Sequence, residues 1–188
     1  MRSLALLFGF LCMISFPLQG TKVTLLPLLG FVLILFSVLR MEKMEQIFKK
    51  AKLILFIAIP ISAVLLGMQI AMSVGVGGKA IDTVYIIIRL LTELCEAAVM
   101  VFIYIGVKKI GVNAELPSLE KHSSRNMTLM IVYIIIYLAI NILHSAMPRL
   151  FTGFEFVIVW PFILGYLWRA FNIWMAYTLL TGITVSKK

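Results

Sequence analysis

The chain has 188 residues, of which 62% are hydrophobic and 13% are charged, and its formal net charge is +9. Soluble domains are about half apolar and about a quarter charged, so this composition excludes an ordinary soluble fold. It predicts an integral membrane protein with the lipid bilayer as a partner. Basic residues collect on the cytoplasmic side of membrane proteins, so the positive charge does not indicate nucleic-acid binding.

Six apolar segments are candidates for membrane-spanning helices. They run over Leu4–Leu18, Val23–Leu39, Leu53–Ser73, Ile81–Val107, Met127–Met147 and Phe154–Ile183. A helix needs about 20 residues to cross about 30 Å of hydrocarbon, and the last four segments meet this length. The first two are shorter and are expected to form a tight hairpin. We therefore predict an all-α fold in which residues 1–188 form a single six-helix transmembrane domain.

The alternative for residues 1–20 is a cleaved signal peptide. The stretch has a basic residue and an apolar core, but it lacks an A-x-A-like cleavage site. We therefore expect these residues to be retained as the first span.

Lysine and arginine residues are concentrated on one side of the predicted membrane domain. With a cytoplasmic N-terminus, twelve of them lie on the cytoplasmic side and three on the other. The twelve are Arg2, Arg40, Lys43, Lys49, Lys50, Lys52, Lys108, Lys109, Lys121, Arg125, Lys187 and Lys188. This bias predicts six spans with both termini in the cytoplasm. We expect the location to be a bacterial cytoplasmic membrane.

Two connections are expected on the cytoplasmic side. Residues 40–52 combine apolar residues at helical spacing with charged residues on the other faces, which predicts a basic amphipathic segment with a Glu45–Lys49 pair. This segment either rests on anionic headgroups or docks a cytoplasmic partner. The docking alternative would use Lys43, Phe48, Lys49 and Lys50. Residues 108–126 contain Pro117 and mixed charge, and are predicted to be an ordinary loop.

Ionisable residues inside a membrane span are costly, and they are therefore candidates for function. The fourth segment places five polar residues on one helical face: Asp82, Tyr85, Arg89, Glu93 and Glu96. Arg89 and Glu93 are spaced to pair within the helix. Glu96 is then expected to be protonated or to meet a cation from another helix, and Arg169 of the sixth segment is the candidate.

Further polar residues are expected in the outer half of the membrane domain, near Asp82 and Arg89. They are Gln69 in the third segment and Asn141 and His144 in the fifth. Their convergence predicts a polar cavity that opens to the outside. The alternative is a buried ion-pair cluster that fixes how the helices pack.

No catalytic motif is present, and the sequence predicts no catalytic residues, no metal site and no cofactor. The two cysteines lie in apolar segments, and Cys95 and His144 are expected at different depths, which argues against a nucleophile–base pair. The small residues Ala63, Gly67 and Ala71 form a stripe on the third segment where another helix can pack closely.

Three functions follow from these features. The first is a transport or solute-binding subunit with an outward-facing polar pocket. In size, number of spans and cytoplasmic termini, the chain resembles the substrate-binding subunits of energy-coupling-factor transporters. Where those subunits have an alanine-rich motif in the first span, this chain has only Ala5-x-x-x-Gly9. The second is an accessory subunit of a larger membrane complex, and the third is an intramembrane enzyme.

Overall fold

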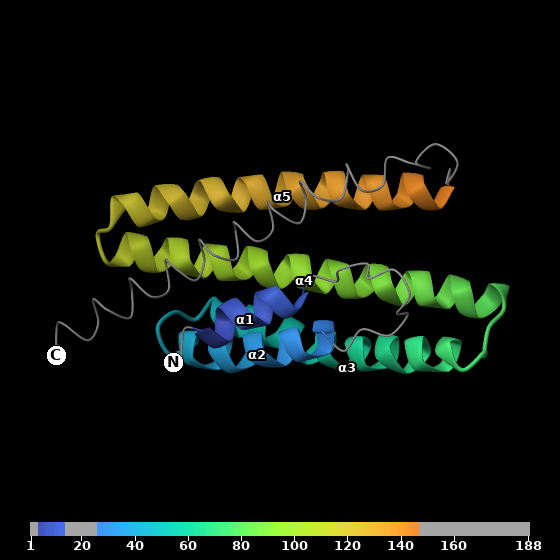
Figure 1. Cartoon of the computed structure of the whole chain (residues 1–188). Helices are drawn as coiled ribbons and strands as arrows, with labels where there is room; N and C mark the ends of the chain where they lie inside the picture. Colours follow the sequence, from blue (N-terminus) through green and yellow to red (C-terminus); the bar gives the residue numbers. More distant parts are fainter. Residues whose placement is uncertain (1–3, 14–25, 147–188) are drawn as a thin grey trace.

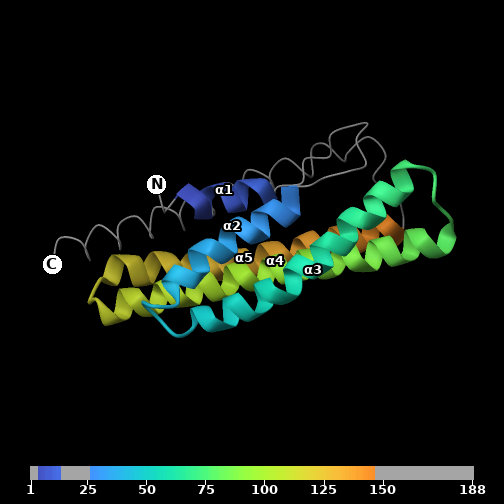
Figure 2. The same cartoon turned by 90° about the horizontal axis from the view of Figure 1, so that it is seen from below.

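The computed structural model of the chain describes residues 4–13 and 26–146, and these residues form helices and short connections. The helices are α1 (Leu4–Met13), α2 (Leu26–Met41), α3 (Phe48–Ser73), α4 (Lys79–Asn113) and α5 (Pro117–Ala146). Consecutive helices pack against each other and run in alternating directions (Figure 1; Figure 2). The all-α prediction is confirmed for this part of the chain. The sixth predicted segment, Phe154–Ile183, lies outside it.

The alternation gives the bundle two ends. We call the end with the α2–α3 and α4–α5 connections the basic end, and the end with the α3–α4 connection the glycine end. Among the described residues, nine lysines and arginines lie at the basic end and only Lys79 lies at the glycine end. The nine are Arg40, Lys43, Lys49, Lys50, Lys52, Lys108, Lys109, Lys121 and Arg125. The fold therefore brings nine of the twelve basic residues that the sequence predicted on one side to one end of the bundle.

α3 is the one helix among the described residues that is long and apolar enough to cross a membrane, judged by length and composition. Its 26 residues rise about 39 Å, more than the hydrocarbon thickness. Only 28% of its most apolar window is buried. The core helix of a soluble protein is mostly buried, whereas α3 exposes Leu53, Phe56 and Val64.

The apolar core lies between α1, α2, α3 and α4. Its largest fully buried side chains are Leu6, Phe10, Phe31, Ile34, Met41, Phe48, Leu55, Met100, Ile103 and Tyr104. Two glycines allow the helices to approach closely. A Cβ atom on Gly106 would lie 2.4 Å from Cζ of Phe48, and one on Gly9 would lie 2.7 Å from Cγ1 of Ile34. The ring of Phe48 therefore rests directly against the backbone of α4.

The small-residue stripe on α3 is arranged differently from these two contacts. Ala63 and Gly67 are exposed, and a Cβ atom on Gly67 would meet nothing within 4 Å. No helix in the described part of the chain packs on this stripe. The predicted close contact is therefore absent between the helices described.

The segment 40–52 is not one continuous amphipathic helix. α2 ends at Met41, residues 42–47 form turns, and α3 begins at Phe48. Met41, Phe48 and Ala51 are all buried in the core, so they do not form a face that rests on headgroups or on a partner. The turn folds the start of α3 back toward the end of α2, which spacing alone does not reveal.

The prediction of a loop over residues 108–126 is wrong, because most of these residues are helical. α4 continues to Asn113 and α5 begins at Pro117, so only three residues connect the helices. Glu115 adopts a φ of 54°, and the amides of Glu115 and Leu116 bond back to Val112 and Gly111, which closes the end of α4 as a Schellman motif. Proline at the first position of α5 fits a helix start, because it lacks only an amide that would have no helical partner.

The contact between Gly106 and Phe48 predicts a position-dependent effect of adding a methyl group. Gly106→Ala should lower the free energy of unfolding by about 1–3 kcal/mol, because the buried ring has no space to move away. Gly67→Ala is the matched control and should leave stability unchanged or raise it by up to about 1 kcal/mol, since alanine favours a helix. Thermal unfolding of the purified variants measures both. Equal effects at the two positions would contradict the packing of Phe48 against α4.

Candidate functional site

The polar face of α4 lies toward the glycine end. Asp82 is exposed in the first turn of the helix. Two turns further on, the structure contains the predicted ion pair, in which Arg89 Nε donates to Glu93 Oε1 over 3.0 Å. The Arg89 side chain is 50% exposed, whereas that of Glu93 is 18% exposed. The carboxylate is therefore largely covered, whereas the arginine side chain that it pairs with is half exposed.

A second polar contact joins α3 to α4 near this ion pair. Gln69 Nε2 donates to the hydroxyl oxygen of Tyr85 over 3.4 Å, and Gln69 is only 6% exposed. Tyr85 lies one turn before Arg89 on the same helix. The sequence predicted Gln69 and Arg89 in the same half of the membrane domain, and the packing of α3 on α4 brings Gln69 into contact with Tyr85.

The third predicted element of the site, α5, packs antiparallel to α4. Arg89 and Asn141 are equally far, counted in residues, from the ends of the two helices at their connection, Asn113 and Pro117. The backbone of Asn141 is thus at the level of Arg89, and that of His144 is one turn nearer the glycine end. The convergence of their side chains with Arg89 stays a prediction.

Glu96 is half-buried on α4, one turn beyond Glu93. Glu96 has an interaction partner in the structure. It is therefore not the isolated carboxylate that remains when only the residues of its own helix are considered. Arg169, the predicted partner, lies outside the described residues.

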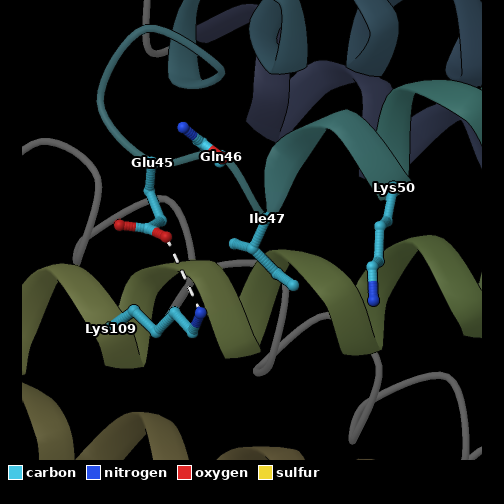
Figure 3. A pocket seen from close by; sticks show the side chains of 5 residues that line it. All are labelled: Glu45, Gln46, Ile47, Lys50 and Lys109. Atoms are coloured by element: carbon cyan, nitrogen blue, oxygen red, sulfur yellow. Dashed lines mark ion pairs between the residues drawn. The ribbon is translucent and has the colours of Figure 1, made fainter.

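The basic end holds a second group of polar residues, around an open cleft between the α2–α3 connection and α4. The cleft has a volume of about 490 Å³ and is lined by Glu45, Gln46, Ile47, Lys50 and Lys109. Figure 3 shows the Glu45 carboxylate and the Lys109 ammonium pointing toward each other from opposite walls. They are 3.8 Å apart, and Asn113 also reaches Glu45 over 3.5 Å.

The ion pairs at this end differ from the predicted one. Glu45 contacts Lys109 on α4 rather than Lys49 on its own segment. Glu42 pairs with Lys52 at 2.6 Å and so joins the α2–α3 turn to the first turns of α3. Sequence reasoning missed both pairs because their partners are brought together by the turn and by helix packing, and not by spacing along one helix.

The predicted docking group Lys43, Phe48, Lys49 and Lys50 is only partly a surface. The three lysines are exposed, but Phe48 is fully buried in the core under Gly106. The assignment of Phe48 to a partner is therefore wrong, because its ring is the apolar contact that fixes the start of α3 on α4. Lys50 extends toward α4, and its ammonium lies 6.0 Å from the ring centroid of Phe102.

Within residues 4–13 and 26–146, no three histidine, cysteine, aspartate or glutamate side chains are placed to hold a metal ion. Comparisons with protein-family models, with curated proteins and with solved structures find no match. The arrangement of side chains is therefore the basis for proposing a function. Arg89 has a half-exposed side chain, and a guanidinium group is chemically suited to binding a carboxylate or phosphate group.

The contact between Gln69 and Tyr85 predicts non-additive mutational effects. Tyr85→Phe should lower the free energy of unfolding by about 1 kcal/mol, because a buried amide loses a partner. In the Gln69→Leu/Tyr85→Phe double variant the loss should be smaller than the sum of the two single losses by at least about 0.5 kcal/mol. Chemical denaturation of the four proteins gives this coupling energy. A coupling energy of zero would show that the two side chains do not interact.

Proposed function

We propose that the chain is a multipass membrane protein with six spans and cytoplasmic termini, which binds a small polar or anionic solute near Arg89 as a transport or solute-binding subunit. The observation that carries the solute site is the Arg89–Glu93 ion pair, with its covered carboxylate and half-exposed arginine side chain. The membrane placement is supported separately by the surface of the helices and by the charge of the two ends.

Large apolar side chains are exposed on every helix of the described part of the chain. Examples, one from each helix in order, are Phe8, Phe36, Leu53, Ile87 and Ile135. Soluble monomers rarely expose such extended apolar surface, whereas lipid favours it. α4 and α5, with 35 and 30 residues, also exceed the length needed to cross the hydrocarbon.

The charge of the two ends supports the proposed orientation. In the part of the chain that the structure describes, the basic end has nine basic residues and the glycine end has Lys79. This asymmetry is expected when the basic end faces the cytoplasm. In this orientation the Arg89–Glu93 pair and the Gln69–Tyr85 contact lie in the outer half of the bilayer, on the side from which a solute would enter.

Cysteine labelling tests the orientation. In a background with Cys12 and Cys95 replaced by alanine, we expect Val76→Cys to react with a membrane-impermeant maleimide on intact cells. Lys43→Cys should react only after the membrane is permeabilised. Both positions are exposed, so reactivity reports sidedness and not burial. The reverse pattern, or reaction at both positions on intact cells, would contradict six spans with cytoplasmic ends.

Substitution of Arg89 tests the solute site. Purified protein is screened by thermal shift against small carboxylates and phosphates, and Arg89→Ala should weaken binding of the stabilising solute at least about tenfold, because a charge-assisted hydrogen bond is lost. Arg89→Lys should retain part of the affinity. Lys79→Ala is the control, because Lys79 is exposed at the same end without a contact to Glu93.

The same variant separates the solute site from a purely structural ion pair. In the proposed outward-facing pocket, water reaches the half-exposed Arg89 side chain, so Arg89→Ala should lower stability by less than about 1 kcal/mol. A loss of about 3–5 kcal/mol with unchanged solute binding would indicate a buried pair that fixes helix packing.

One observation favours the accessory-subunit alternative. Ala63 and Gly67 face outward on α3 beside the exposed Val64, with no described helix on this stripe. Small residues let helices approach closely, so this surface would suit a neighbouring transmembrane helix. In that case Gly67→Leu should dissociate a hetero-complex seen by native mass spectrometry in mild detergent. A monomer that retains a small molecule would favour the solute-binding function.

A further inference from the structure

The α2–α3 connection retains positive charge after its acidic residues are paired. Residues 40–52 contain five basic and two acidic side chains. Glu42 pairs with Lys52, and Glu45 pairs with Lys109 of α4. The exposed lysines 43, 49 and 50 therefore have no acidic residue of this connection left to neutralise them. This part of the surface attracts anions.

The positively charged surface at this end contains the open cleft described above. Lys50 and Lys109 line opposite sides of it, from α3 and α4, and Ile47 forms an apolar part of the wall between them (Figure 3). The cleft is shallow and open to the surface, so it suits a headgroup that is only partly enclosed. The Lys109 ammonium has three N–H donors, so it can contact an anion in the cleft while it stays paired with Glu45 at 3.8 Å.

An apolar strip on α3 begins directly beside these lysines. Leu53 follows Lys50 by three positions and Lys49 by four, so it lies on the same side of the helix. Leu53 is 64% exposed, and Phe56 and Ile57, one turn further on, are also exposed. Val64 continues the strip along α3. Cations at one end of an apolar strip match a phospholipid, whose charged headgroup is joined to long acyl chains.

We propose that the cleft formed by Glu45, Gln46, Ile47, Lys50 and Lys109 binds the headgroup of an anionic phospholipid from the adjoining leaflet. Lys50 and Lys109 contact the phosphate, and the acyl chains lie along Leu53 and Phe56. The Phe102 ring, 6.0 Å from the Lys50 ammonium, favours the orientation of this side chain toward the cleft. The inference rests on the proposed membrane placement and is independent of the solute site at Arg89.

Lipid competition measured by native mass spectrometry tests this site. Purified protein in neutral detergent is given equal amounts of phosphatidylglycerol and phosphatidylcholine with identical acyl chains. The wild-type protein should bind phosphatidylglycerol preferentially. Lys50→Gln/Lys109→Gln should reduce this preference by about fivefold for each lysine removed. Both side chains are exposed, so the variant is expected to fold, and its melting temperature verifies this.

The control is Lys43→Gln/Lys121→Gln, which removes two exposed lysines of the same end from outside the cleft. It should keep the wild-type preference. An equal loss in the control would overturn the site in favour of diffuse surface charge. Displacement of phosphatidylglycerol by millimolar inorganic phosphate would overturn it in favour of a free-anion site.

A separate measurement distinguishes failure of this inference from failure of the proposed membrane placement. Protein that stays in carbonate-washed membranes but shows no preference for phosphatidylglycerol contradicts the lipid site alone. Protein that the carbonate wash releases contradicts both. Retention in the membrane together with a preference that the cleft variant loses and the control keeps supports the site.

Discussion

The burial of the Phe48 ring against Gly106 fixes how the first turn of α3 sits on α4, and the rest of the basic end follows from it. With α3 held there, the turn over residues 42–47 brings Glu42 to Lys52 and Glu45 to Lys109. The same contact sets the antiparallel packing of α3 on α4 that places Gln69 opposite Tyr85 at the glycine end. One apolar contact without space for a methyl group thus supports the arrangement of polar groups at both ends.

The apolar core and the polar contacts of α4 occupy different parts of the bundle. Its apolar core lies between the first four helices, while the Arg89–Glu93 pair and the Gln69–Tyr85 contact lie toward the glycine end. Large apolar side chains are exposed on each of these helices. Such a surface suits a surrounding of lipid, and the cost of placing Arg89 and Glu93 there is reduced because they pair with each other. This is the physical basis for the proposed membrane placement and solute site.

Features that depend on periodicity within one helix were predictable from the sequence. The helical segments, the Arg89–Glu93 pair and the common level of Gln69 and Tyr85 required only helix geometry and the order of the connections. Features that depend on contacts between elements were not. The helical spacing of residues 40–52 could not show that Phe48 turns into the core, and the charges of residues 108–126 concealed that both helices extend through most of that stretch. The sequence predicted Lys49 as the partner of Glu45, but the partner is Lys109, because the packing of the helices decides which cation lies near Glu45.

The central claim, that the exposed apolar face of α3 contacts lipid, is tested most directly by spin labels along that face. Labels at Ile57 and Val64, in protein reconstituted into vesicles with the native cysteines replaced, report whether oxygen or a water-soluble nickel complex reaches each site. Both positions are exposed, so a label does not disturb the core. The account predicts relaxation by oxygen and not by nickel at these two sites, and the opposite at Lys43. Relaxation by nickel at Ile57 and Val64 would show that the face lies in water and would contradict the account.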